Sequence, residues 1–326
     1  MATKKVVLLS IPHSTYCEAA RWTLQAAGVA FTELDYLLGV DNRIYPTVVT
    51  HARSLDTNLL SRLSKSIPVG GLEGRSDDVN NERKATQMVP CAIASSSKNV
   101  LGDSFEIANY AAANSNKKLK PLMIDQVTMD IYGAACRQLT YRYIAKSTTL
   151  THDQQAKLGL DFYCCIGDEK FYNEQFEFYD GFIDQFNTLL IRAFNADDDA
   201  VLKKTMDIIN NMFEYVEKEL SDGRKFLGGD QLSVDDIMLA AHGSWLVFPE
   251  TFGQGICTRF PSIEQMPDEY LGICKSFAST VAGQHIIKLY ENHRDFKSTP
   301  VDIMYRPDPK DAIDFCNEIF NSGGRL

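Results

Sequence analysis

The sequence lacks any hydrophobic run close to the roughly 20 residues that a membrane-spanning helix needs, so no membrane partner is expected. It also lacks an excess of basic residues, because 33 Lys and Arg stand against 43 Asp and Glu, for a net charge of −10. Nucleic-acid binding needs clustered Lys and Arg to neutralise phosphates. The composition therefore predicts neither a nucleic-acid nor a membrane partner.

A signal-peptide pattern is missing from the first residues, which lead directly into a short apolar run. The eight cysteines have no regular spacing, which is typical of reduced thiols and not of a disulfide framework. We therefore expect a cytoplasmic protein. Cys164 and Cys165 are adjacent, but no His or Cys stands at ligand spacing from them, so no metal site is expected.

A strand, a helix and a second strand are predicted at the start of the chain. Lys5–Ile11 is short and rich in branched residues, as buried strands are. Apolar residues recur at helical spacing over Thr15–Ala27, and Gly28 follows where a helix end favours glycine. Val29–Tyr36 supplies the second strand, and a right-handed crossover predicts that the two strands are parallel.

Ser14 lies directly before this predicted helix. Its hydroxyl and the free backbone N–H groups of the first turn point to one place, which favours an anion because the helix dipole acts in the same direction. The simpler interpretation is that Ser14 is only the N-cap of the helix.

A second group of motifs follows a long irregular region. Met88–Ala94 reads as a strand with Pro90 near its beginning, where a missing N–H donor requires an edge, a bulge or a special turn such as a cis bond. The next residues predict a hairpin return, after which Asp103 or Ser104 caps a helix that ends near Ala113. This order of elements is that of a thioredoxin-type domain.

With these motifs in place, the chain resembles the N-terminal domain of glutathione transferases over residues 4–38 and 86–114. The resemblance implies glutathione as co-substrate, with Ser14 contacting its sulfur. It also implies that Val89, before a cis Pro90, pairs with the tripeptide backbone, and that Asp103 with Ser104 holds the γ-glutamyl end. S-T-Y-C also resembles the C-P-Y-C redox turn with Ser in place of the first Cys.

The second half of the chain is predicted to be helical. Ser233 and Asp236 form a capping box before an apolar helix, and the surrounding string resembles the N-capping segment of the glutathione transferase helical domain. Helical spacing further predicts helices over residues 124–143, 174–194, 200–220 and 267–290. In the second of these, Phe178, Phe182, Phe186 and Leu189 are expected to face inward.

The predicted fold class is an α/β thioredoxin-like N-terminal domain followed by an all-α helical-bundle C-terminal domain. The first domain would span residues 1–115, the second 116–298, and an extended tail with a possible short helix 299–326. Residues 39–86 form an atypical insertion, in the region that touches the glycyl end of glutathione in the family. Arg43, Arg53 and Lys84 are cations of this region, although surface charge is their simpler interpretation.

The function implied by the resemblance is conjugation of glutathione to a small hydrophobic electrophile, as in detoxification, by a homodimer. The alternatives are a non-catalytic binding or assembly protein of the same fold, and a thiol-transferase that uses Cys17. His13 beside Ser14 does not predict a Ser/His pair, since sequence neighbours seldom point at each other. His242 is expected in the core, and His285 and His293 on the surface.

Overall fold

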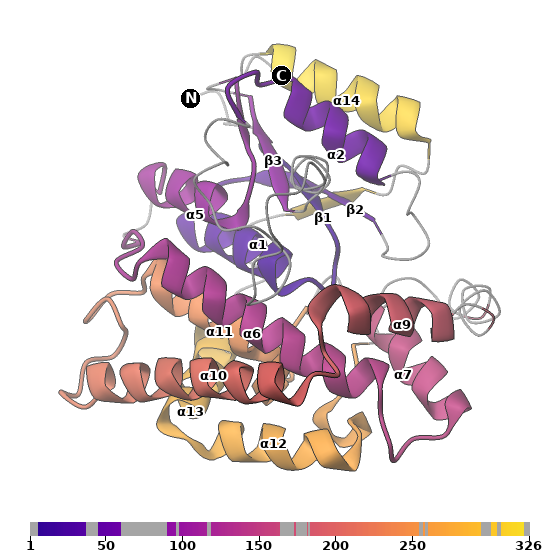
Figure 1. The fold of residues 1–326 in the computed structure, drawn as a ribbon. Helices are drawn as coiled ribbons and strands as arrows, with labels where there is room; N and C mark the ends of the chain where they lie inside the picture. The colour runs from indigo at the N-terminus through magenta and orange to yellow at the C-terminus, as the bar shows by residue number, and fades with distance from the viewer. Residues whose placement is uncertain are drawn as a thin grey trace.

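The computed structural model describes residues 6–36, 45–59, 90–95, 98–115, 119–163, 173, 181, 183–253, 257, 260–294, 301–304 and 308–322. Among these residues no helix is long and apolar enough to cross a membrane. Two layers of structure are visible in Figure 1, a sheet flanked by helices and a larger helical region beneath it.

A five-stranded sheet forms the core of the N-terminal region, in the order β4-β3-β1-β2-β5. Its strands are β1 Val6–Ser10, β2 Phe31–Asp35, β3 Cys91–Ala94, β4 Asn99–Leu101 and β5 Val301–Met304. β1 and β2 are parallel, as predicted, and β3 and β4 form the predicted antiparallel hairpin.

Helices cover both faces of the sheet (Figure 1). α1 (Thr15–Ala27) and α5 (Ser104–Ala113) pack on one face, and α2 (Tyr45–Ser54) and α14 (Pro309–Ser322) on the other. Side chains of β1 alternate between the two layers, because successive strand residues point to opposite faces. Val6 and Leu8 join the cluster of α1 and α5, whereas Val7 and Leu9 join that of α2 and α14.

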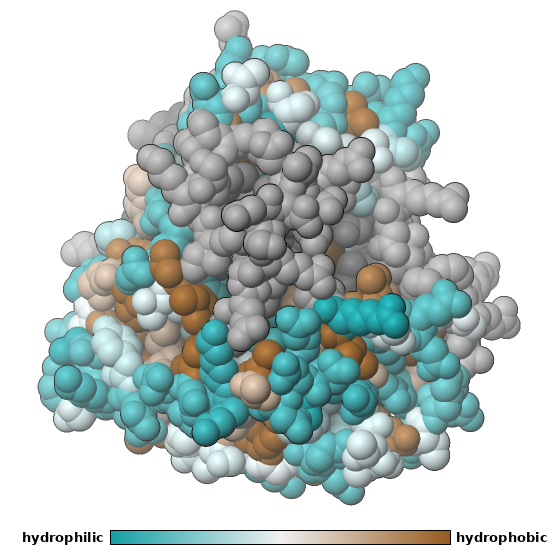
Figure 2. All heavy atoms as spheres, in the orientation of Figure 1, coloured by the Kyte–Doolittle hydropathy of each residue, from teal (hydrophilic) through white to brown (hydrophobic). Residues whose placement is uncertain are grey.

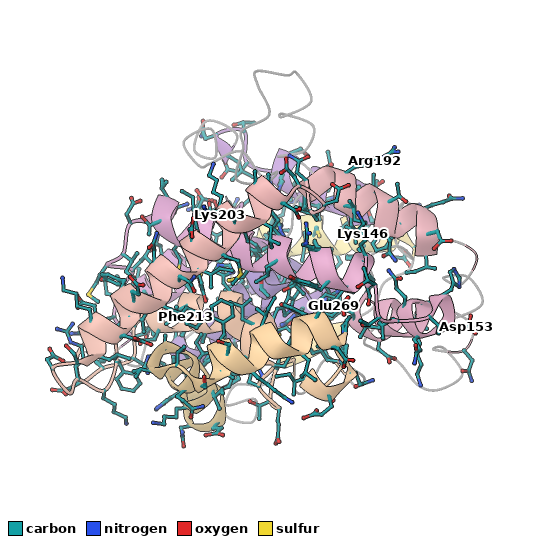
Figure 3. The ribbon with its side chains drawn as sticks, turned by 60° about the horizontal axis from the view of Figure 1, so that its bottom comes forward. Lys146, Asp153, Arg192, Lys203, Phe213 and Glu269 are labelled. Atoms are coloured by element: carbon teal, nitrogen blue, oxygen red, sulfur yellow. The ribbon has the colours of Figure 1, made fainter. Side chains whose placement is uncertain are left out.

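The helical region is built around α11 (Val234–Val247), all of whose residues are buried. It packs against α1 of the first region and against α6 and α13, among others. The remaining elements are α6 Gln126–Ala145, α7 His152–Tyr163, α9 Ile183–Phe194, α10 Asp199–Leu220, η1 Ile263–Gln265, α12 Asp268–Ser279 and α13 Val281–His293. In Figure 3, Phe213 of α10 lies on the side of α12, where its ring centroid is 5.1 Å from that of Phe277.

The predicted capping box is confirmed at the start of α11. The Ser233 hydroxyl accepts a hydrogen bond from Asp236 N at 3.2 Å, and Ser233 N donates to Asp236 Oδ2 at 3.0 Å. Asp236 Oδ1 also accepts from Leu227 N, so the box ties the preceding loop to the helix. The box and the hydrogen bond from Val234 N to the Lys120 carbonyl thus supply acceptors for donors in the first turn of this buried helix.

Two predictions about the helices are wrong. The helix expected over residues 267–290 is divided into α12 and α13 at Thr280, whose hydroxyl caps the second helix by accepting from Gly283 N at 3.0 Å. Leu189 was expected to face inward but is 60% exposed, although Phe186 is buried as predicted. Phe178 and Phe182 lie outside the described residues.

The C-terminal residues do not form an extended tail, which corrects the expectation for residues 299–326. β5 pairs in parallel with β2 and thereby covers that edge of the sheet. α14, which includes the short helix that the sequence predicted, packs on α2 through Ala312, Cys316 and Ile319. β5 and α14 are thus part of the N-terminal layer. The boundaries at 115 and 298 remain predictions.

Candidate functional site

The strand register places the starts of α1, β3 and α5 together at one end of the strands of the sheet. Leu9, near the end of β1, is opposite Cys91, the first residue of β3, and Ala92 is opposite Leu101 of β4. The turn that follows β1, the residue before β3 and the turn after β4 therefore lie side by side. These segments carry Ser14, Pro90 and the pair Asp103 and Ser104. The predicted site residues that the structure describes therefore lie at the same end of the strands, which we call the Ser14 edge of the sheet.

Ser14 is the N-cap of α1, as the simpler interpretation held. Its partly exposed side chain accepts a hydrogen bond from Cys17 N at 3.4 Å. A hydroxyl has one hydrogen to donate and two lone pairs to accept with. Capping uses a lone pair only and does not consume the Ser14 O–H, which also lies within hydrogen-bonding reach of the Cys17 thiol, so capping and donation to a bound anion are compatible.

Cys17 is fully buried in the first turn of α1, and its Sγ accepts from Ile11 N at 3.4 Å. Burial raises the pKa of this thiol to about 12, despite the opposing hydrogen bonds from the Ile11 backbone and Ser14. Because the thiolate is the reactive form, Cys17 is poorly suited to the thiol-transferase alternative at neutral pH.

Asp103 and Ser104 begin α5. Asp103 is the N-cap and accepts from Glu106 N at 2.7 Å, and burial raises the pKa of its carboxyl. Ser104, the first helical residue, is 1% exposed, and its hydroxyl has no hydrogen-bond partner among the residues that the structure describes. A buried polar group left unpaired costs about 1–3 kcal/mol. A ligand at this helix N-terminus, where an anion is favoured, would give the hydroxyl a hydrogen-bond partner.

Asp130 of α6 lies close enough to Asp103 for their charges to interact, a neighbour of this place that the sequence analysis missed. Burial, followed by the charge of Asp103, raises the pKa of Asp130 to about 7, although Arg137 opposes the shift. Two carboxyl groups close together in a buried place favour a cationic ligand between them, because a positive charge lets both ionise. No local motif marks Asp130, which reaches Asp103 only through the packing of α6 against the first region.

The remaining predicted residues of this edge have different outcomes. Pro90 is buried directly before β3, whereas Val89, Arg43 and Lys84 lie outside the described residues. Arg53 is not a surface charge as expected, because it is buried and Nη2 donates to the carbonyl of Gly102. It supports the turn that leads into Asp103.

His13, next to Ser14, is enclosed by the rings of Phe162, Tyr163 and Trp245. Burial lowers the pKa of His13 to about 3, against a weaker effect of the Tyr163 backbone. The imidazole is therefore uncharged at neutral pH, and its aromatic contacts join the turn before α1 to α7 and α11. This arrangement agrees with the absence of a Ser/His pair.

The other histidines divide between the core and buried contacts. His242 is buried as predicted, and its ring centroid is 4.5 Å from that of Tyr16. His285 was expected on the surface but is only 9% exposed, and its Nε2 lies 3.0 Å from Asp236 Oδ1. His293 is partly buried, with its ring centroid 5.0 Å from that of Phe226.

A buried ionic network lies behind the start of α1. Glu18 contacts Arg21 Nη1 at 2.7 Å and Arg294 Nε at 2.7 Å, and Arg21 Nε donates to Glu33 Oε2 at 2.8 Å. Burial and the charge of Glu33 raise the pKa of Asp35 well above its ordinary value. Arg21 and Arg294 are thus paired with Glu18 and Glu33, and the raised pKa of Asp35 favours its uncharged form.

This network also joins the two regions of the chain. Arg294 follows α13 of the helical region, and Glu18 belongs to α1 on the sheet. Beside the ion pair, Trp22 Nε1 donates to the His293 carbonyl at 3.1 Å, and Arg294 Cζ lies 5.6 Å from the Trp22 ring. The position of α1, and thus of Ser14, is fixed from the helical side.

Comparison with known proteins yields one family match, over residues 199–265, to the C-terminal domain of glutathione S-transferases. The match covers α10, α11 and the capping box between them. No curated protein matches this sequence.

Solved structures to which the chain is similar include, at low sequence identity, glutathione transferases and a beta-etherase. A glutathione transferase GSTFuA3 from Phanerochaete chrysosporium is 13% identical, with a TM-score of 0.42, over 90% of this chain and 98% of that chain. A Ceriporiopsis subvermispora glutathione S-transferase in complex with glutathione is 15% identical, with a TM-score of 0.41, over 88% of this chain and 96% of that one. The beta-etherase LigF from a Sphingobium strain is 14% identical, with a TM-score of 0.39, over 87% of this chain and 98% of that one.

The family match is limited to residues 199–265 of the helical region, and the first four strands of the sheet, with α1 and α5, precede these residues in the chain. The thioredoxin-type order β1-α1-β2, β3-β4, α5 precedes a helical region that contains the matched residues. Residues 199–265 are thus similar to the C-terminal domain of glutathione S-transferases, and the strands and helices that precede them have the thioredoxin-like order of elements.

Proposed function

We propose that the chain is a glutathione transferase-like enzyme, which activates the glutathione thiolate for attack on a small hydrophobic electrophile. The observation that supports this most is the unpaired buried hydroxyl of Ser104 beside the carboxyl groups of Asp103 and Asp130. The γ-glutamyl end of glutathione carries a carboxylate and an ammonium group on one carbon. The hydroxyl and helix N-terminus suit the carboxylate, and the two acids suit the ammonium.

In this proposal the Ser14 hydroxyl donates its hydrogen to the sulfur of glutathione. A thiol of pKa about 8.5 is only a few per cent ionised at neutral pH, and a downward shift of about two units corresponds to about 2.7 kcal/mol. A charge-assisted hydrogen bond and the N-terminus of α1 together can supply that amount. The thiol proton passes to solvent, and the C–S bond forms as the leaving group departs with its electron pair.

Replacement of Ser14 by alanine tests this role. We expect turnover to fall by about 10- to 100-fold and the pKa of the bound thiol to rise, with a stability loss of about 1 kcal/mol from the lost cap. Ser14→Thr, which keeps a hydroxyl, is the matched control. Wild-type turnover in Ser14→Ala would exclude this role for Ser14.

The alternative is a non-catalytic protein of the same fold that binds a ligand or takes part in assembly. Retention on immobilised glutathione with no turnover of any electrophile class would favour it. The absence of any glutathione binding would contradict both the enzyme and a glutathione-dependent carrier. Pro90, buried directly before β3, is proposed to keep Val89 available to the tripeptide backbone in either case.

We also propose a homodimer. Hydrophobic surface gathers in the region where α6 begins (Figure 2), and Met123 and Val127 there are 56% and 43% exposed. Pairing of two copies would bury such side chains, which contribute favourable free energy when removed from water. Light scattering should give twice the chain mass of 36.6 kDa, and a monomer would contradict the proposal.

A further inference from the structure

Arg137 of α6 lies at the boundary between the two regions and has no ion-pair partner among the residues that the structure describes. Its Cζ lies 5.2 Å from the centre of the Tyr16 ring and 4.7 Å from the centre of the Phe194 ring. Nε is buried without a hydrogen-bond partner, and the guanidinium makes no ion pair with any residue that the structure describes. Arg137 as a residue is partly buried, and an anion would compensate the part of its charge that is withdrawn from water.

The groups around Arg137 do not neutralise it. His242 is uncharged at neutral pH, since burial and then the charge of Arg137 lower its pKa to about 3. Burial raises the pKa of the Tyr16 hydroxyl above its ordinary value, so that group is uncharged as well. The nearby acid is Asp130, but burial and then the charge of Asp103 raise its pKa to about 7 in spite of Arg137, so it is only partly ionised at neutral pH. The positive charge is therefore available to a ligand.

The position of Arg137 relates it to the proposed reaction. Tyr16 is in the first turn of α1, two residues after Ser14, and its ring faces α6 and α11 through Arg137 and His242. Tyr141, one helical turn beyond Arg137, has its ring centroid 5.0 Å from that of Phe194. Arg137 thus lies among aromatic rings near the residue proposed to hold the sulfur.

We propose that Arg137 is a specificity-determining residue, which selects acceptors that carry a carboxylate on an aromatic or otherwise apolar body. A guanidinium binds a carboxylate through two parallel N–H donors, and the rings of Tyr16 and Phe194 suit the apolar part. This inference rests on the proposed function, because it names the acceptor class for the thiolate at Ser14.

The test uses two stable conjugates, S-(4-carboxybenzyl)glutathione and S-(4-methylbenzyl)glutathione, which differ only in the charged group. Isothermal titration compares them in the wild type, in Arg137→Met, in Arg137→Lys and in Lys203→Met. Met keeps the length and apolar contacts of Arg137, and Lys keeps the charge without the planar donors. Lys203, exposed on α10, is the matched control for the change in net charge (Figure 3).

We expect the wild type and Lys203→Met to prefer the carboxylate conjugate by about 10- to 100-fold, the range of a hydrogen bond to a charged group. Arg137→Met should lose this preference and bind the methyl conjugate as the wild type does, and Arg137→Lys should keep part of it. Equal binding of the two conjugates by the wild type would overturn the inference. So would an equal loss for both conjugates and for glutathione itself in Arg137→Met, because Arg137 would then bind the tripeptide.

The same titrations separate this inference from the proposed function. If glutathione and both conjugates fail to bind the wild type, the proposed function is wrong. In that event 4-methylbenzoate, which has no tripeptide, tests Arg137 alone. Binding that Arg137→Met abolishes would support a carboxylate site, and binding that it leaves unchanged, or no binding, would refute one. Circular dichroism and unfolding midpoints verify that each variant is folded.

Discussion

Replacement of Arg294 by methionine should destabilise the protein, because it leaves a carboxylate inside the interface without its second cation. Glu18 and Arg294 have no exposed side-chain surface, and Arg294 Nε and Nη2 lie 2.7 and 3.1 Å from the Glu18 carboxylate. Met retains the approximate volume and can still pack against Trp22. The perturbation is thus mainly the loss of charge and hydrogen bonds.

Removal of one partner of a buried ion pair costs about 3–5 kcal/mol. Glu18 keeps Arg21 at 2.7 Å, so we expect the lower part of this range at neutral pH. In the wild type, burial opposes ionisation of Glu18, but Arg294 and Arg21 more than compensate and lower its pKa. The lowered pKa stabilises the fold above the ordinary pKa of Glu, and this stabilisation is lost as the pH falls through the folded value. In Arg294→Met the pKa of Glu18 should rise, so the stability difference should shrink as the pH falls from 7 toward 4.

Urea unfolding at several pH values measures these differences. Lys288→Met, an exposed change on α13, is the control for loss of a positive charge. The double variant Glu18→Gln with Arg294→Met should be more stable at neutral pH than Arg294→Met alone, because no unpaired carboxylate remains. Wild-type stability of Arg294→Met at neutral pH, or a difference that does not depend on pH, would refute the role given to this pair.

Three further predictions concern separate parts of the chain. Ser233→Ala should lower the free energy of unfolding by about 0.5–2 kcal/mol without changing the glutathione affinity of the folded protein, and loss of binding at unchanged stability would show that Ser233 belongs to the ligand site. Ile319→Ala should cost about 2–4 kcal/mol in urea unfolding, as buried Ile-to-Ala changes do, whereas exposed Asn321→Ala should cost little; equal effects would contradict the packing of α14 on α2. Glutathione binding should weaken as the pH falls below about 7, where Asp130 becomes protonated, and calorimetry in buffers of different ionisation enthalpy should detect release of a proton on binding. An affinity that depends on pH in the wild type but not in Asp130→Asn would support the proposed contact of Asp130 with the ammonium group. The same pH dependence in both proteins would refute it.

Features with local signals could be predicted from the sequence. The β1-α1-β2 unit, the Ser14 and Asp103 caps and the Ser233 capping box each depend on residues within a few positions of one another. α7 was missed although it has such a signal, since Thr151 and Gln154 exchange capping hydrogen bonds at 2.9 and 3.3 Å. The break at Thr280 likewise follows a capping residue within an otherwise helical pattern.

Features that depend on distant segments could not be predicted. β5 pairs with β2 across most of the length of the chain, and nothing in residues 301–304 specifies that partner. The same holds for the pairing of Arg294 with Glu18 and for the approach of Asp130 to Asp103. For the site, the sequence therefore predicts Ser14, Asp103 and Ser104, but the groups that reach it from α6 emerge only from the packing.

The central claim, that the edge containing Ser14 and Ser104 binds glutathione by its thiol and γ-glutamyl ends, is tested most directly by calorimetric titration. Glutathione and the dipeptide Cys-Gly, which lacks the γ-glutamyl group, are titrated into the wild type and into Ser104→Ala. We expect saturable binding of glutathione by the wild type. Cys-Gly should bind the wild type about 10- to 100-fold more weakly than glutathione does, and glutathione should bind Ser104→Ala about 10- to 100-fold more weakly than the wild type, as expected for the loss of a hydrogen bond to a charged group. Equal binding of both peptides, or no binding of glutathione, would contradict the claim.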